Sequence, residues 1–237
     1  MPVLEPRAQR SRVVTTDAFA APQAPSRRIA RRVAIGVAIV ALFAAAWLLW
    51  KNVVEPRVVP KRFGVVIDHS LYRSGRIHPS LLPQVLDRYG IDDIVALTYP
   101  GSASQYQALE ASLATARGIR VERFGLDGDG TGNPATVVDA LVAIHAAVAR
   151  GDQVLVQCAA GSERTGGVVY LYRTLVLGES PDAAYAELLR YGHRPSRNPH
   201  LETFLNAHMA YFADALAARG IAQPPAALPH LPEPTSR

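Results

Sequence analysis

Short apolar runs alternate with longer segments of helical periodicity between residues 63 and 219. The apolar runs have the length of buried strands, and the segments between them have the length and periodicity of helices. Proline often stands at the expected start of a helix and glycine just past its end. The pattern predicts strands over residues 63–67, 71–73, 94–97, 119–124 and 153–157, and helices over residues 79–89, 103–117, 134–150, 165–177, 181–191 and 199–219.

Strands that alternate with helices predict an α/β fold. We expect a single domain with a central, mostly parallel sheet and helices on both faces. About 155 residues are enough for one hydrophobic core and too few for two. Residues 125–133 are rich in glycine and are expected to form an irregular loop.

The segment 33–50 holds eighteen residues without a charge. As a helix it would be about 27 Å long, close to the hydrocarbon thickness of a bilayer. Trp47, Trp50 and Lys51 stand at its far end, as anchors at a membrane surface do. A cleaved signal peptide usually has a shorter apolar core, and a buried core helix is rarely apolar on every face. We therefore predict one transmembrane helix before the domain, in contact with membrane lipids.

Positive charge is concentrated around that helix. The chain has a net charge of +5, and residues 1–62 hold eleven of its 25 basic residues but only three of its 20 acidic ones. Such a distribution suits anionic lipid headgroups and gives no argument for nucleic acid. We predict a basic disordered tail over residues 1–32, a linker over 51–62, the domain over 63–219 and a proline-rich C-terminal tail over 220–237. Seven arginines in the tail favour a cytoplasmic N-terminus and a domain on the outer, extracytoplasmic side, although Lys51, Arg57, Lys61 and Arg62 reduce the asymmetry.

The only cysteine, Cys158, follows the last predicted strand and begins a run of eight residues that ends in Arg164 and Thr165. A tight loop between a strand and a helix can point its N–H groups inward, where they favour a thiolate and a bound phosphate. The planar guanidinium of Arg164 could hold two phosphate oxygens. This combination predicts a covalent cysteinyl-phosphate intermediate. The predicted phosphate-binding residues are Ala159, Ala160, Gly161, Ser162, Glu163 and Arg164.

The run resembles the signature loop of the protein tyrosine phosphatase superfamily, Cys-x5-Arg-Ser/Thr, and especially that of bacterial members of the dual-specificity branch. Residues 71–75 (Leu-Tyr-Arg-Ser-Gly) also resemble an element near the start of such domains, so the similarity spans roughly residues 64–213. It implies hydrolysis of a phosphorylated protein, lipid or small molecule without a cofactor. The seven histidines have no ligand spacing, so no metal site is predicted.

The resemblance also implies a general acid, an aspartate about thirty residues before the cysteine. Asp127 and Asp129 lie 31 and 29 residues before Cys158, and the spacing ahead of Pro134 favours Asp129. Glu163 is a further candidate acid, or else forms an ion pair that faces outward.

Other residues of the two matching elements have implied or alternative roles. Thr165 is expected to bond the sulfur and help hydrolyse the intermediate, and it could also cap the following helix. Arg73 and Ser74 are expected to support the signature loop, although an ordinary surface arginine would fit the sequence at position 73 nearly as well.

Gln157 departs from the family pattern, which has a histidine before the cysteine. A glutamine can donate a hydrogen bond but has no titratable positive charge. The sequence therefore predicts a membrane-anchored, cysteine-dependent phosphatase, with a weak or inactive phosphate-binding module as the alternative. Sulfur transfer on a rhodanese-like loop fits less well, because it would give the Arg-Thr pair and the upstream aspartates no purpose. The loop itself contains no lysine, which argues against heavily phosphorylated inositols as substrates.

Overall fold

A computed structural model describes residues 27–221 and 227–233. The chain divides into two compact units, residues 1–47 and residues 48–237. Most of the tail predicted over residues 1–32 lies outside the described residues, as do parts of the predicted C-terminal tail.

The apolar segment is helical and runs further than predicted. Helix α1 (Arg27–Leu49) is followed by a π-helical turn, η1 (Trp50–Val54), and a short helix, α2 (Glu55–Val58). Ala34–Val58 is long and apolar enough to cross a membrane. Residues 51–58, which we predicted as linker, are therefore helical. The π turn explains how the helix passes Pro56: Glu55 donates its N–H to the Trp50 carbonyl five residues back, and the wider turn accommodates a proline ring that would clash in a regular helix.

Five strands form one sheet in the order β1-β2-β5-β3-β4. Strands β1 and β2 are antiparallel, whereas β5 is parallel to both of its neighbours and β3 is parallel to β4. The predicted mostly parallel sheet is confirmed. The strands are β1 (Gly64–Ile67), β2 (Leu71–Ser74), β3 (Asp93–Ala96), β4 (Arg120–Arg123) and β5 (Val154–Gln157).

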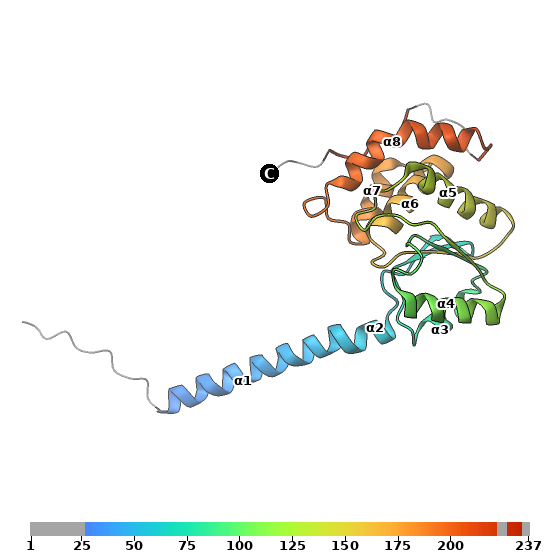
Figure 1. Cartoon of the computed structure of the whole chain (residues 1–237). Helices are drawn as coiled ribbons and strands as arrows, with labels where there is room; N and C mark the ends of the chain where they lie inside the picture. Colours follow the sequence, from blue (N-terminus) through green and yellow to red (C-terminus); the bar gives the residue numbers. More distant parts are fainter. Residues whose placement is uncertain (1–26, 222–226, 234–237) are drawn as a thin grey trace, which may run out of the picture. The chain divides into compact units, whose positions relative to one another are not determined.

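Helices cover both faces of this sheet. Figure 1 shows α3 and α4 on one side and α5, α6, α7 and α8 on the other. The central strand β5 divides its side chains accordingly: Val154 and Val156 belong to one core cluster, and Leu155 belongs to the other. The helices are α3 (Leu82–Tyr89), α4 (Ser104–Arg117), α5 (Pro134–Ala149), α6 (Glu163–Leu171), continued by the π-helical η2 (Tyr172–Val176), α7 (Pro181–Arg190) and α8 (His200–Ala217).

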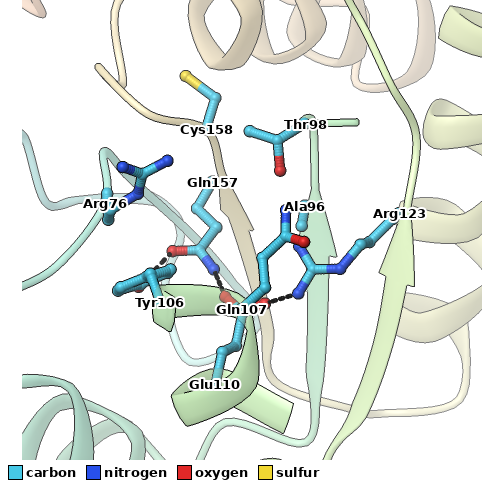
Figure 2. A pocket seen from close by; sticks show the side chains of 9 residues that line it. All are labelled: Arg76, Ala96, Thr98, Tyr106, Gln107, Glu110, Arg123, Gln157 and Cys158. Atoms are coloured by element: carbon cyan, nitrogen blue, oxygen red, sulfur yellow. Dashed lines mark hydrogen bonds and ion pairs between the residues drawn. The ribbon is translucent and has the colours of Figure 1, made fainter. Parts of the chain in front are cut away.

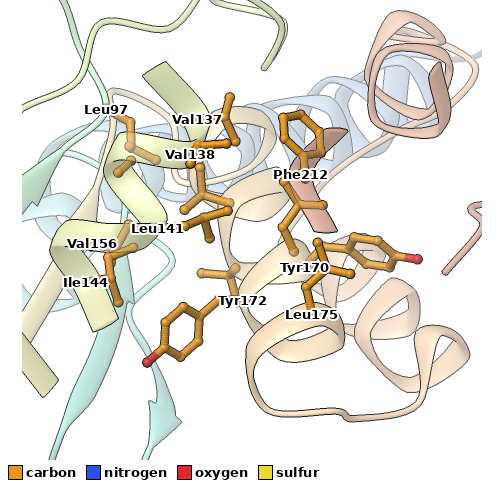
Figure 3. Packing of buried hydrophobic residues seen from close by; sticks show 14 of the residues in the cluster. Leu97, Val137, Val138, Leu141, Ile144, Val156, Tyr170, Tyr172, Leu175 and Phe212 are labelled. Carbon is orange, nitrogen blue, oxygen red and sulfur yellow. The ribbon is translucent and has the colours of Figure 1, made fainter. Parts of the chain in front are cut away.

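The larger cluster joins the sheet to α5, α6 and α8. Figure 3 shows Val137, Val138 and Leu141 of α5 between Leu97 and Val156 on one side and Tyr170 of α6 and Phe212 of α8 on the other. Both ends of α5 follow the sequence closely. Asn133 caps it by accepting the Ala135 N–H at 2.9 Å, Pro134 opens it, and the chain turns with positive φ at Gly151.

Two predicted boundaries differ from those in the structure, and hydrogen bonds explain both differences. The helix expected from residue 79 begins at Leu82, because Leu81 and Ser80 fold back onto His78 in a turn. Part of the predicted C-terminal tail belongs to the core. Leu231 is fully buried, and the Asn206 side chain bonds its backbone N–H at 2.8 Å and its carbonyl at 3.0 Å. Apolar burial and these two bonds hold the segment on α8.

Candidate active site

The signature loop lies at the carboxyl edge of the sheet, between β5 and α6. Ser74, Gln157 and Ala96 stand side by side at the ends of the three central strands, so Cys158 begins at the point where these strands stop. The Gly161 N–H donates to the Cys158 sulfur at 3.1 Å, and the cysteine is buried. The loop therefore directs a backbone N–H at the sulfur, and such a contact favours an anion.

Gly161 and Gly75 allow two backbones to touch behind the loop. Gly161 has φ +81°, and a Cβ there would lie 2.4 Å from the Gly75 nitrogen. A Cβ at Gly75 would lie 2.5 Å from the Ala160 carbonyl oxygen. Thr165 lies inside α6 and does not cap it, and in place of the expected bond to the sulfur it donates its hydroxyl to the Ser74 carbonyl at 3.4 Å. The end of β2 thus supports the loop from behind, which is the role expected for this element.

Arg73 is the main side-chain support of the loop. It is fully buried, donates to the Gly161 carbonyl at 3.0 Å and to Glu187 of α7 at 3.0 Å, and stacks 3.9 Å from the centre of the Tyr191 ring. Burial lowers the pKa of Arg73, and the ion pair with Glu187 opposes that shift. Arg73 therefore acts as an internal strut that joins the loop to α7 and is not a surface arginine.

Arg164 reaches from the start of α6 toward the glycine-rich loop. Its Nη1 donates to the Leu126 carbonyl at 3.4 Å, and its buried Nε has no hydrogen-bond partner within the described residues. A buried guanidinium N–H without a partner is costly unless a ligand completes it. Arg164 follows Cys158 by six residues in the same run, so a phosphate oxygen held by this loop would be a suitable acceptor.

Glu163 does not form the outward ion pair that we considered. Its carboxylate contacts Nδ1 of His193, which is fully buried and whose Nε2 lies 2.5 Å from Glu202 of α8. Tyr185 donates its hydroxyl to the same Glu202 oxygen at 3.1 Å. Burial disfavours a charged His193, but its bonds to Glu163 and Glu202 outweigh burial and raise the pKa of His193 to about 9. Nothing in the sequence indicated this pair, because His193 lies thirty residues from Glu163 along the chain.

This pairing predicts a pH-dependent stability. Below pH 6.5 His193 is protonated in both the folded and the unfolded chain, so its ion pairs contribute fully. As pH rises toward 9, only the folded chain keeps the proton, and the free energy of unfolding falls by on the order of 2 kcal/mol. Urea unfolding at several pH values checks this, with His193→Gln as the comparison. A stability gap between wild type and variant that stays constant from pH 6.5 to 9 would contradict the assignment.

The two candidate acids differ in their contacts. Asp129 accepts the N–H of Thr131 at 3.0 Å and its hydroxyl at 2.7 Å. Burial opposes ionisation, but these two bonds prevail and lower the pKa of Asp129 below its usual range. Asp127 is exposed and accepts only the Tyr99 hydroxyl, at 3.1 Å, among the side-chain hydrogen bonds of the described residues. Asn198, which sequence reasoning missed, anchors this loop by donating to the Asp129 carbonyl at 2.6 Å.

Gln157 belongs to a buried network behind Cys158. Its amide nitrogen donates to Glu110, its oxygen accepts the Tyr106 hydroxyl at 3.4 Å, and Glu110 also pairs with Arg123. Figure 2 shows the Gln157 side chain directed toward Tyr106 and Glu110, while the Cys158 sulfur points away from it. Burial raises the pKa of Glu110, and Arg123 and Gln157 oppose the shift. Nothing in the sequence indicated Tyr106, Glu110 and Arg123 in this network, because all three lie far from Gln157 along the chain.

Comparison with known proteins shows the fold. No family model and no curated protein matches the chain. Among solved structures, the PP-IP phosphatase SIW14 from S. cerevisiae in complex with citrate is 17% identical, with a TM-score of 0.53 over 69% of this chain and 97% of that chain. P. aeruginosa TpbA in complex with pTyr is 21% identical, with a TM-score of 0.52 over 68% and 98%. A putative phosphatase from Shewanella putrefaciens CN-32 is 22% identical, with a TM-score of 0.52 over 68% and 96%. The chain has the fold of these phosphatases, in agreement with the resemblance of its signature loop.

Proposed function

We propose that this chain is a cysteine-dependent phosphatase that hydrolyses phosphomonoesters through a cysteinyl-phosphate. The observation that supports it best is the loop itself, in which Cys158 accepts the Gly161 N–H, and Arg164, six residues further on, has a buried Nε without a partner among the described residues. The Cys158 thiolate attacks phosphorus, and the bond from phosphorus to the leaving oxygen breaks. Arg164 and the loop amides hold the phosphoryl oxygens. Water then attacks phosphorus, the S–P bond breaks, and the thiolate returns.

The contacts reverse our preference for the general acid. Thr131 donates two hydrogen bonds to the Asp129 carboxylate, and these bonds lower the pKa of Asp129. Asp129 is therefore suited to fixing the conformation of the loop. Asp127 is exposed, and the carbonyl of its neighbour Leu126 is the acceptor for Arg164. We therefore assign proton donation to the leaving oxygen to Asp127, with the same carboxylate taking the proton from water in the second step. Glu163, which is bonded to buried His193, is assigned to support of the loop.

Replacing Asp127 by asparagine is expected to lower kcat about 100-fold for phenyl phosphate. The loss for p-nitrophenyl phosphate should be much smaller, because p-nitrophenolate leaves without a proton. Asp129→Asn is the matched variant, and its effect should be the same for both substrates. Steady-state kinetics on the two esters check this. A selective loss on phenyl phosphate in Asp129→Asn and not in Asp127→Asn would return the role to Asp129.

Membrane attachment through the apolar helix is part of the proposal. The span Ala34–Val58 supports it by length and composition, and basic residues precede it in the chain. We assign the N-terminus to the cytoplasm and the domain to the extracytoplasmic side. Protease protection of intact and lysed spheroplasts tests both points, since an outward domain is digested without lysis.

Gln157 favours a second candidate function, a phosphate-binding module without turnover. Its side chain bonds Glu110 and Tyr106 and supplies no titratable group next to the nucleophile. Phosphate binding by the full chain without vanadate-sensitive hydrolysis of any aryl phosphate would select this candidate.

A further inference from the structure

A groove of about 650 Å³ borders the signature loop. It extends from η1 and α2 to the residues that follow β2, and it reaches Ala159 next to Cys158. Four cationic side chains line it, and three of them, Lys61, Arg62 and Arg76, lie at its end near the signature loop. A volume of this size accommodates a ligand of several hundred daltons.

The cationic side of the groove is attached to the signature loop. Lys61 Nζ donates to the Ala159 carbonyl at 3.2 Å, and Arg62 Nη1 donates to the Ala160 carbonyl at 2.8 Å. Arg76 bonds the Ala159 carbonyl through its backbone N–H at 3.2 Å, and its guanidinium lies 5.2 Å from the centre of the Tyr106 ring, in the smaller cavity that Cys158 also lines. Within residues 27–221 and 227–233, none of these three cations forms an ion pair with a carboxylate. Burial, followed by the charge of Arg62, lowers the pKa of Lys61, as expected for cations crowded without a counter-ion.

This end of the groove is next to Cys158, because Lys61 and Arg76 both bond the carbonyl of Ala159. Arg76 lines the groove and also lines the smaller cavity that contains Cys158 (Figure 2). An anion held in the groove would therefore lie next to a phosphoryl group at Cys158. The sequence argument against several phosphates considered the signature loop alone. It missed the positive charge that Lys61, Arg62 and Arg76 bring to the loop from other segments.

The rest of the groove is largely apolar, and part of it lies on the helical end of the membrane-length segment. Lys51, Glu55 and Pro56 of Ala34–Val58 line it. The chain has only two lysines, Lys51 and Lys61, and both line this groove. Basic residues that directly follow an apolar span face lipid headgroups. The apolar lining residues are Pro56, Val59, Pro60, Ile77 and Pro79.

We propose that the groove binds a second anionic group of a membrane-lipid substrate, so that the preferred substrate is a phospholipid with a phosphomonoester in addition to its phosphodiester. The phosphomonoester reaches Cys158, the phosphodiester lies among Lys61, Arg62 and Arg76, and the apolar side takes the start of the lipid tail. This inference rests on the proposed phosphatase function. A phosphopeptide fits less well, because the groove adjoins the membrane-length segment and has an apolar side.

The test uses the full-length chain in neutral detergent and three substrates. p-Nitrophenyl phosphate has one anionic group, glycerophosphoinositol 4-phosphate has two, and phosphatidylinositol 4-phosphate has two with acyl chains. Wild type is expected to have its highest kcat/KM on the lipid. The informative quantity is the ratio of kcat/KM for the lipid to kcat/KM for p-nitrophenyl phosphate. Arg76→Gln and Lys61→Gln should each lower this ratio about 10-fold, because each removes one charge-assisted contact. Arg88→Gln, an exposed arginine on α3, is the matched control and should keep the ratio.

Three results would overturn the inference. The first is a ratio that Arg76→Gln and Lys61→Gln leave unchanged. The second is a phosphotyrosine peptide, assayed alongside the three substrates, that wild type prefers over the lipid. Equal kcat/KM for the lipid and its soluble headgroup, with the ratios still lowered in the variants, would reassign the groove to soluble bisphosphates and overturn the lipid assignment.

A binding measurement separates failure of this inference from failure of the proposed function. If wild type hydrolyses none of the three substrates, the phosphatase proposal is wrong. Calorimetric titration of wild type with glycerophosphoinositol 4-phosphate then tests the groove alone. Arg76→Gln should raise the dissociation constant about 10-fold, and Arg88→Gln should leave it unchanged. Equal affinities in wild type and Arg76→Gln would refute the groove as an anion site.

Discussion

Replacing Cys158 by serine is expected to lower kcat for p-nitrophenyl phosphate by at least about a thousandfold. A serine hydroxyl stays protonated at neutral pH and is a far weaker nucleophile than a thiolate. The substitution removes little volume, and Cys158 packs in the large core cluster beside the loop amides. The folded structure should therefore persist.

Two measurements separate loss of chemistry from loss of structure in Cys158→Ser. The melting temperature should stay within a few degrees of wild type, and calorimetry should still detect phosphate, because Arg164 and the loop N–H groups remain. Hydrolysis at an undiminished rate would refute the covalent mechanism. A collapsed melting temperature would show that the sulfur has a structural role instead.

The second large effect is expected at Arg73. Arg73→Met removes the strut between the loop and α7 and should lower the free energy of unfolding by about 3 kcal/mol, because Glu187 loses a buried partner. Arg173 still pairs with Glu187 at 2.5 Å, which limits the loss. Activity should also fall, since the Gly161 carbonyl loses its donor and the loop loses its fixed shape.

Arg190→Met is the matched control for Arg73→Met. Arg190 lies 5.5 Å from the same Tyr191 ring, but it is exposed. Its replacement should change the free energy of unfolding by less than about 0.5 kcal/mol. Urea unfolding and aryl phosphate turnover of both variants check the comparison. Equal stabilities for the two variants would show that the buried ion pair contributes nothing.

The order of strands and helices was predictable from sequence. Prolines and glycines act on their own backbone, so Asn133-Pro134 marks the start of a helix without help from tertiary contacts. The proposed nucleophile and the proposed phosphate-binding arginine lie within eight consecutive residues between a strand and a helix. The sequence pattern and its resemblance to a known signature loop therefore indicated Cys158 and Arg164, whose roles stay a prediction.

Everything that supports or surrounds the loop depended on contacts between distant segments. Arg73 and Glu187 are 114 residues apart, and Lys61 bonds a carbonyl 98 residues away. The Asp129 loop is likewise held by Asn198, which lies 69 residues away and donates to the Asp129 carbonyl. The amino-acid sequence determined by itself the order of the strands and helices, and it indicated the residues proposed for the chemistry of the loop. The tertiary structure decided which charges meet at that loop, because burial, ion pairing and the cationic groove are made by side chains that are far apart in the chain.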